Sequence, residues 1–206
     1  LIHASKKDEF VQALRGSLQS FFGDDPASSY NYGKIINEKQ FNRLITYLSQ
    51  GNILHGGKHD ISKLFIEPTI IEPGSLNSPL MTDEIFGPIV PVITYEDPAD
   101  AVVIIHRNPN PLAFYVFTSS SKKEKWWLEE VRFGGGCVNN ASWHLTNHHL
   151  PFGGRGNSGI GHYHGKFSFD TFSHHKAIMK TPTWFDPAIK YPPFKGKLGL
   201  FKKIIR

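Results

Sequence analysis

The first part of the chain carries apolar residues at helical spacing. One series has its members three or four positions apart: Phe10, Val11, Leu14, Leu18 and Phe21. This spacing predicts an amphipathic helix of about sixteen residues. Ser5, with Asp8 three positions later, resembles a capping box and predicts the start of that helix. The sequence Gly-Asp-Asp-Pro at residues 23–26 predicts its end.

A second helix is predicted after Asn37, a residue type that suits an N-cap. Its apolar face is formed by four residues: Phe41, Leu44, Ile45 and Leu48. Gly51 predicts its end. Beyond it, residues 52–55 and 64–71 predict two strands that flank a Gly-Gly turn at residues 56 and 57.

From residue 89 onwards, predicted strands alternate with predicted helices. The strands cover residues 89–95, 113–118 and 137–139. Asp97, followed by Pro98, opens the first helix, and Ser121 caps the second. Strands separated by helices of about ten to twelve residues indicate an α/β fold with a parallel sheet and right-handed crossovers. After about residue 176 proline and lysine become frequent, which predicts a C-terminal arm along the surface.

Composition excludes several classes of protein. No apolar run approaches the roughly 18 residues that a membrane span requires. The single cysteine, Cys137, excludes an internal disulfide framework and favours a reducing, cytoplasmic compartment. The net charge of +5 is accounted for by the basic residues at positions 195–206, where no acidic residue occurs. The rest of the chain is therefore neutral, which argues against nucleic acid as a partner.

The first residues lead directly into the predicted helix. Leu1, Ile2, His3 and Ala4 form a short apolar, extended run without an initial methionine. We interpret this run as the end of a strand whose beginning is missing, so that the chain is a fragment of a longer protein. A processed N-terminus is the alternative.

A glycine cluster lies at residues 151–161. Gly154, Gly156 and Gly159 satisfy the pattern G-x-G-x-x-G. A dinucleotide-binding fingerprint also needs a preceding strand, a following helix and an acidic residue about twenty positions on. Pro151 interrupts a strand, and neither Asp170 nor Asp186 has that spacing. We therefore expect a structural turn in which the backbone packs closely against another segment.

The histidines and the single cysteine are the candidate reactive groups. His144, His148 and His149 have a spacing that could bind zinc if they lay on a helix. Asn147 and Pro151 favour a loop instead, and no H-E-x-x-H motif is present. No metal site is therefore predicted.

Cys137 lies in a short strand pattern, Gly-Cys-Val-Asn. We interpret it as a structural cysteine; a nucleophile paired with a loop histidine is the alternative.

Several motifs, read in order, resemble those of the aldehyde dehydrogenase superfamily. They are EPTI (67–70), EIFGPIVPV (84–92), NP (108–109), LAFYVFTS (112–119), LPFGG (150–154), NSGIG (157–161), YHGK (163–166), SFDTFSH (168–174) and YPP (191–193). The later ones resemble the class 3 and fatty aldehyde dehydrogenase branch. Asn139-Asn140 departs from the Asn-Asp pair frequent in class 3 proteins.

The resemblance implies a parallel, three-layer catalytic domain of aldehyde dehydrogenase type at residues 1–176, followed by a C-terminal arm and basic tail at 177–206. It also implies roles for six residues. Glu84 would accept hydrogen bonds from the hydroxyls of the nicotinamide ribose of NAD or NADP, because a carboxylate offers two acceptor oxygens. Phe86 would pack beside the nicotinamide ring, and Phe152 would line an aldehyde tunnel. Asn140, Gly153 and Gly154 would hold the backbone near the active centre.

The implied reaction is NAD(P)-dependent oxidation of an aldehyde to a carboxylic acid through a cysteine thioester. By this resemblance the nucleophile, the general base and the Rossmann domain lie before Leu1, and Cys137 does not match the nucleophile motif. No catalytic residue is therefore assigned here, and the fragment alone is expected to be inactive. A non-catalytic folding or association module, or a cysteine hydrolase using Cys137, are the alternatives.

The resemblance further implies a homodimer that acts on hydrophobic aldehydes. The basic and apolar tail at residues 195–206 predicts either weak contact with an anionic membrane or an arm that packs on the dimer partner or over the substrate entrance. We favour the packed arm. We also expect the EIFGP turn (residues 84–88) and the PFGG loop (residues 151–154) to face one cavity.

Overall fold

A computed structural model describes residues 1–205. The strands are β1 (Ile2–His3), β2 (Gly51–His55), β3 (His59–Asp60), β4 (Phe65–Ile66), β5 (Thr69–Pro73), β6 (Ile89–Pro91), β7 (Thr94–Tyr95), β8 (Ala113–Val116) and β9 (Gly135–Val138). The helices are α1 (Lys7–Phe22), α2 (Glu38–Tyr47), α3 (Pro79–Thr82), α4 (Pro98–His106), α5 (Ser121–Glu130), α6 (Gly165–Thr171) and α7 (Leu198–Ile204). Short 3-10 turns precede α1 and occur in several loops. The predicted α/β class is confirmed.

Parallel pairing dominates the sheets. Strand β5 pairs with β6 in parallel, with Thr69 opposite Ile89, and β2 joins the other edge of β5 in antiparallel orientation. Strands β8 and β9 are parallel and are connected through α5, which makes a β-α-β unit. Strand β1 pairs in parallel with β7, so the first residues of the chain lie beside residues 94 and 95.

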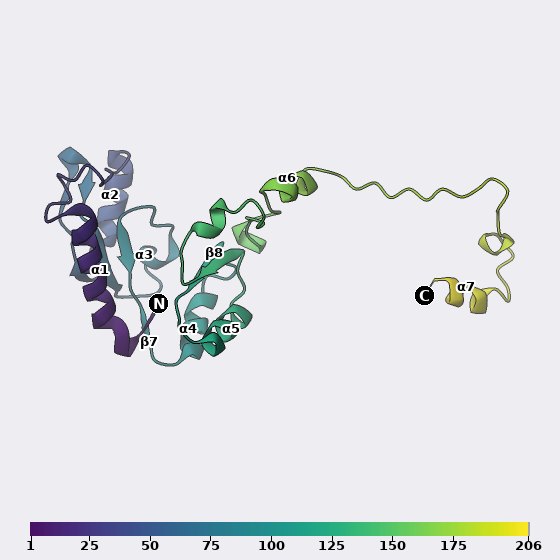
Figure 1. The fold of residues 1–206 in the computed structure, drawn as a ribbon, viewed down its shortest axis with the longest axis horizontal. Helices are drawn as coiled ribbons and strands as arrows, with labels where there is room; N and C mark the ends of the chain where they lie inside the picture. The colour runs from purple at the N-terminus through teal and green to yellow at the C-terminus, as the bar shows by residue number, and fades with distance from the viewer. Residues whose placement is uncertain (206) are drawn as a thin grey trace.

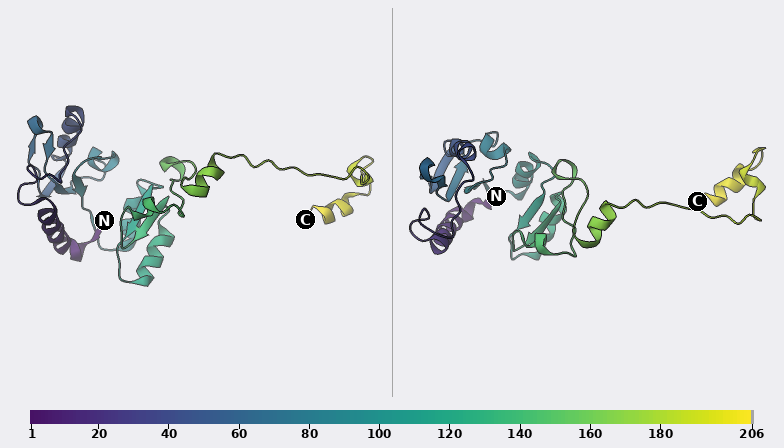
Figure 2. Two further views of the ribbon diagram at one scale, coloured as in Figure 1. Left: turned by 45° about the horizontal axis from the view of Figure 1, so that its top comes forward. Right: turned by 90° about the horizontal axis from the view of Figure 1, so that it is seen from above.

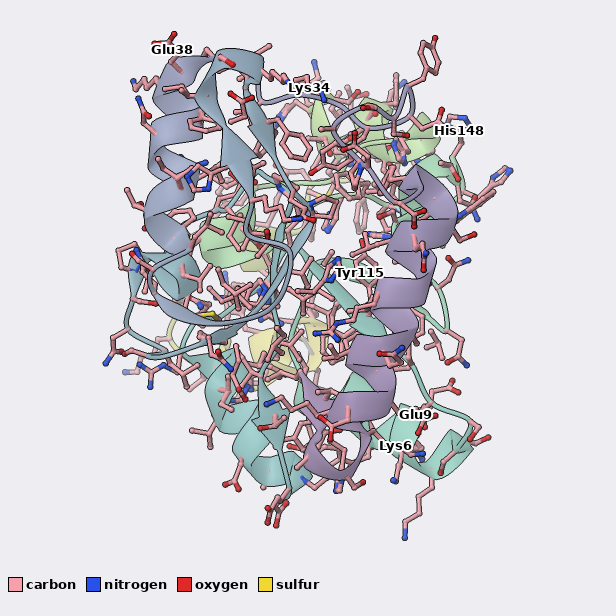
Figure 3. The ribbon with its side chains drawn as sticks, turned by 90° about the vertical axis from the view of Figure 1, so that its left-hand side faces the viewer. Lys6, Glu9, Lys34, Glu38, Tyr115 and His148 are labelled. Carbon is pink, nitrogen blue, oxygen red and sulfur yellow. The ribbon has the colours of Figure 1, made fainter. Side chains whose placement is uncertain are left out.

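Two helices cover opposite faces of the β2-β5-β6 sheet. Neighbouring strand residues point to opposite faces, and Ile70 and Ile71 of β5 do so here. Ile71 is buried in a cluster that includes Phe41 and Leu44 of α2, whereas Ile70 packs with Val11 of α1. Figure 3 shows the two helices on either side of the strands, running in opposite directions, with Glu38 at the start of α2 and Lys6 and Glu9 beside the start of α1. The result is three layers, as predicted.

Several predicted boundaries are confirmed and others need correction. Helix α1 has 16 residues, and the Asn37 side chain caps α2 by accepting from the backbone N–H of Gln40. The predicted capping box at Ser5 is wrong. Nδ1 of His3 accepts from the Ser5 backbone N–H, which starts a 3-10 turn before α1. Helix α5 is capped by Ser120, one position before the predicted Ser121.

The predicted strands at residues 64–71 and 89–95 are each divided in the structure. The first gives β4 and β5, separated at Glu67 and Pro68, because proline cannot donate a ladder hydrogen bond. The second gives β6, which pairs with β5, and β7, which pairs with β1. Phe10 and Phe21, predicted on the buried face of the first helix, are 38% and 66% exposed, so only the middle of that face packs.

The last part of the chain leaves the rest of the molecule. After α6, residues 173–182 have no regular secondary structure, and Figures 1 and 2 show this segment running away from the sheets to the separate helix α7. Met179 on this segment and Trp184 just after it are 91% and 83% exposed. Within residues 1–205, no helix combines the length and the apolar composition that crossing a membrane would require.

Candidate functional site

The EIFGP turn connects α3 to β6. Glu84 is exposed and Phe86 is 84% exposed, whereas Ile85 between them packs against the core cluster beneath. The backbone of Phe86 has φ 48°, in the left-handed region that residues other than glycine seldom adopt. The turn therefore presents a carboxylate and an aromatic ring to the outside while Ile85 fixes it to the core.

Helix α2 contacts this turn from the side. The guanidinium of Arg43 donates to the backbone carbonyls of Glu84 and Ile85, at 3.1 and 2.7 Å. The carboxylate of Glu84 has no hydrogen bond or ion pair with any residue in the range 1–205, so both of its oxygens are open to a ligand. Arg43 could not be singled out from the sequence, because one basic residue on a helix carries no distinctive pattern.

The PFGG loop holds Phe152 in an aromatic cluster. Its backbone forms an antiparallel bridge with Tyr163, with N–H···O distances of 3.0 and 2.9 Å. The ring contacts Tyr163 edge-on, with centroids 5.3 Å apart, and stacks on His164 at an interplanar angle of 26°. His144 contacts it with centroids 5.7 Å apart. Phe152 is thus partly buried and oriented by its neighbours.

The two glycines of this loop are sites of close backbone approach. A Cβ atom at Gly153 would lie 2.3 Å from the carbonyl oxygen of Gly161, and one at Gly154 would lie 2.2 Å from that of Ser158. Neither position has room for a side chain. The prediction of a closely packed structural turn is confirmed, and no strand feeds directly into it.

Asn140 is exposed, and its side-chain oxygen accepts from the next backbone N–H, that of Ala141. The preceding residue, Asn139, instead joins the segments that follow β8 and β9. Its side-chain amide accepts from the Thr118 N–H at 2.8 Å and donates to the Thr118 carbonyl at 2.9 Å. This contact was not predicted, although asparagine at the end of a strand, in a left-handed turn (φ 53°), is a recognisable signal.

Cys137 is half-buried on β9, and its sulfur lies 3.7 Å from Nδ1 of His144. Within residues 1–205 no group of three His, Cys, Asp or Glu side chains could hold a metal ion. His148 contacts the ring of His164, with centroids 5.8 Å apart, and His149 is exposed.

The two candidate segments belong to different parts of the molecule. Figures 1 and 2 place α3, which precedes the EIFGP turn, on the side of the N-terminal half that faces the β8–β9 unit. Asn108 donates to the Met81 carbonyl at 3.4 Å, and Arg107 donates to the Asn77 side chain. One cavity lies along α7 and another beside α1, and neither of them is lined by Glu84, Phe86 or Phe152. The shared cavity therefore stays a prediction.

Comparison with known proteins gives the context for these segments. The sequence profile of the aldehyde dehydrogenase family matches residues 1–178. The chain belongs to the aldehyde dehydrogenase family. It is 40% identical to 4,4'-diaponeurosporen-aldehyde dehydrogenase of Staphylococcus aureus, over 100% of this chain and 45% of that protein. It is 39% identical to the dimeric NADP-preferring aldehyde dehydrogenase of Mus musculus, over 96% of this chain and 44% of that protein.

Solved aldehyde dehydrogenase structures share its fold. The substrate-bound state of Staphylococcus aureus AldH superposes with a TM-score of 0.88 at 40% identity, covering 100% of this chain and 45% of that one. The Mycobacterium tuberculosis aldehyde dehydrogenase complexed with NAD+ gives a TM-score of 0.75 at 26% identity, over 90% of this chain and 40% of that one. The chain thus spans less than half the length of the relatives that it matches.

Proposed function

We propose that the whole protein carrying this chain is an NAD(P)-dependent aldehyde dehydrogenase that oxidises aldehydes to carboxylic acids through a thioester. The observation that carries the proposal is the EIFGP turn, where the free carboxylate of Glu84 and the exposed ring of Phe86 stand two positions apart. These groups fit the ribose hydroxyls and the flat ring of a nicotinamide nucleotide. When bound, that cofactor accepts the hydride from the aldehyde carbon.

In this proposal Glu84 accepts hydrogen bonds from the ribose hydroxyls, and Phe86 limits the movement of the nicotinamide ring. Relatives whose names or structures include NADP preference or bound NAD+ support both nucleotides as candidates. Phe152 lines the aldehyde site, where an aromatic ring favours hydrophobic substrates. Asn140, Gly153 and Gly154 hold the backbone near that site, and the close packing of the two glycines supports this role.

The cofactor assignment is tested by replacing Glu84 with glutamine and Phe86 with alanine in the whole protein. Each change should raise the Kd for NAD or NADP by about tenfold, as expected when one hydrogen bond to a charged group or one packed ring is lost. Glu130→Gln, an exposed glutamate on α5, is the matched control and should bind the cofactor normally. Unchanged affinity in both Glu84→Gln and Phe86→Ala would exclude the proposed cofactor site.

The substrate assignment is tested separately. Phe152→Ala should raise the KM for a long-chain aldehyde by about tenfold while changing that for acetaldehyde much less, because the lost contact is apolar. Phe169→Ala, at a 70% exposed phenylalanine on α6, is the control. A uniform effect on both aldehydes would indicate that Phe152 supports the loop without contacting the substrate.

We further propose a cytoplasmic homodimer made of a catalytic region (residues 1–176) and an arm (177–206) that packs on the dimer partner or over the substrate entrance, with weak membrane contact as the alternative. The name of the mouse relative supports the dimer, and light scattering of the purified protein tests it. On α7 the apolar residues Leu198, Leu200 and Ile204 are exposed, and the same short helix carries Lys202 and Lys203 in its last turn. Such a surface suits the interface of an anionic bilayer.

Vesicle co-sedimentation tests the membrane contact. The whole protein should bind vesicles containing phosphatidylserine better than vesicles of phosphatidylcholine alone. The double substitution Lys202→Glu and Lys203→Glu should abolish the difference, since each lysine near an anionic surface contributes about 1 kcal/mol. The same change at Lys122 and Lys123 of α5 is the control. If the α7 variant binds phosphatidylserine vesicles as well as the unmodified protein does, membrane contact through the tail is excluded and the packed arm is left.

A further inference from the structure

Arg43 on α2 contacts both other residues of its own helix and the EIFGP turn. The guanidinium of Arg43 donates to the carbonyls of Glu84 and Ile85, more than forty positions along the chain. The same side chain donates to the hydroxyl of Tyr47 at 2.6 Å and to the side-chain carbonyl of Gln40 at 2.8 Å. The planar guanidinium of Arg43 is therefore held by residues of α2 on one side and by the turn on the other.

Tyr47 extends this contact to the residue that precedes the turn. Its ring is 1% exposed in the main core cluster, and the guanidinium of Arg43 lies over it, 5.4 Å from the centroid. Its hydroxyl accepts from Arg43 and donates to the carboxylate of Asp83 at 3.1 Å. Asp83 immediately precedes Glu84, so three consecutive residues, Asp83 to Ile85, are connected to one turn of α2.

The backbone of the EIFGP turn needs such support. Phe86 has φ 48°, a conformation that costs of the order of a kilocalorie per mole and persists only where neighbours enforce it. Gly87 packs against α2 as well, since a Cβ there would lie 2.6 Å from Cδ2 of Leu44. On the far side, the Thr69 N–H donates to the Pro88 carbonyl at 2.9 Å. The turn is thus fixed by α2 on one side and by β5 on the other.

We propose that Arg43 is a positioning residue that sets the direction in which the EIFGP turn presents Glu84 and Phe86. Its charge is directed at backbone carbonyls and leaves the Glu84 carboxylate free for a ligand. The inference rests on the proposed role of this turn in binding the nicotinamide half of the cofactor. It adds a residue that touches neither cofactor nor substrate and acts through the shape of the turn.

Cofactor binding to the whole protein tests the inference with two ligands. Arg43→Gln should raise the Kd for NAD or NADP by about tenfold, and leave the Kd for AMP, which lacks the nicotinamide half, within about twofold. Arg43→Lys retains the charge without the fork and should recover only part of the affinity. Tyr47→Phe, which keeps the buried ring, should give a smaller loss of the same kind and serves if Arg43→Gln does not fold. Arg15→Gln is the matched control, because Arg15 donates to the Leu54 carbonyl on another element.

A double-mutant cycle separates this inference from the function on which it rests. If Arg43 acts through Glu84 and Phe86, Arg43→Gln should weaken binding much less in a protein that already carries Glu84→Gln and Phe86→Ala. Additive losses, equal losses for AMP and the dinucleotide, or unchanged affinity in Arg43→Gln would each overturn the inference. If Glu84→Gln and Phe86→Ala themselves bind normally, the proposed cofactor site fails instead.

Discussion

The sulfur of Cys137 on β9 lies 3.7 Å from Nδ1 of His144, seven positions along the chain. This is the pairing that a cysteine hydrolase would need, but the histidine argues against it. His144 is only 6% exposed, and its Nε2 has no hydrogen-bond partner within residues 1–205. A thiolate–imidazolium pair would place a charged N–H donor at Nε2 without an acceptor, which costs well above 1 kcal/mol. The geometry therefore favours a structural role for this contact.

We predict that Cys137 reacts slowly with thiol reagents in the folded protein. At neutral pH its alkylation, followed by mass spectrometry of the peptide that contains it, should be slower than in the protein unfolded in urea. Cys137→Ala should lower the free energy of unfolding by about 1 kcal/mol, the range for removing a small, partly buried side chain. Rapid labelling of the native protein would instead favour the hydrolase alternative.

Asn139 should contribute measurably to stability. Asn139→Ala removes two hydrogen bonds to the Thr118 backbone and places alanine in a left-handed conformation. We expect a loss of about 2–3 kcal/mol in the free energy of unfolding, measured with urea. Asn139→Gly keeps the conformation and isolates the hydrogen bonds, at about 1–2 kcal/mol. The neighbouring exposed Asn140→Ala is the control and should cost less than about 0.5 kcal/mol; equal losses at both positions would contradict this assignment.

Much of the fold could be predicted because the relevant interactions are local. The caps at Asn37 and Asp97 each bind a backbone N–H two or three positions away, so their chemistry is visible in the sequence. The parallel β8–α5–β9 unit follows from alternating strand and helix patterns. At Ser5 the local rule failed, because His3 offered a competing acceptor for the same N–H.

The candidate site was predictable only in part. Glu84, Phe86 and Phe152 were found through motifs that resemble those of a known family. The contacts that hold them come from distant segments, as when Arg43 reaches carbonyls more than forty positions away, and spacing along the chain gives no sign of these. Helical periodicity indicates which residues of α2 are buried, but it does not indicate which distant segment of the chain packs against the helix.

Gly87 should tolerate no side chain. A Cβ there would meet Leu44, which is fully buried at 0% exposure and cannot move aside without disturbing the core cluster. We expect Gly87→Ala to lower the free energy of unfolding by about 1–3 kcal/mol, as overpacking does. Gly16→Ala is the matched control, because nothing lies within 4 Å of its Cβ position in α1 and alanine should stabilise that helix by about 0.5–1 kcal/mol. If both substitutions stabilise the protein, the core beside Gly87 is looser than the structure indicates.

Tyr32 should make the protein less stable in alkaline solution. Its hydroxyl donates to the Ile66 carbonyl at 2.6 Å, and burial, helped by the nearby Glu67, raises its pKa well above the usual value. Because the unfolded chain releases this proton near pH 10 and the folded chain retains it, the free energy of unfolding should be fully maintained below that pH and fall as the pH rises above it. Burial also raises the pKa of Tyr95, so Tyr32 accounts for part of this fall.

Tyr32→Phe measures how much of this alkaline loss of stability is due to Tyr32. At pH 7 it should cost about 1 kcal/mol for the lost hydrogen bond, and above pH 10 its stability should fall less steeply than that of the unmodified protein. Tyr30→Phe is the matched control, because Tyr30 is fully exposed and its removal should leave the slope unchanged. Urea denaturation at a series of pH values between 8 and 11 measures both slopes. Parallel curves for Tyr32→Phe and the unmodified protein would show that Tyr32 releases its proton equally well in the folded and unfolded states, and that its contact with Ile66 does not hold it.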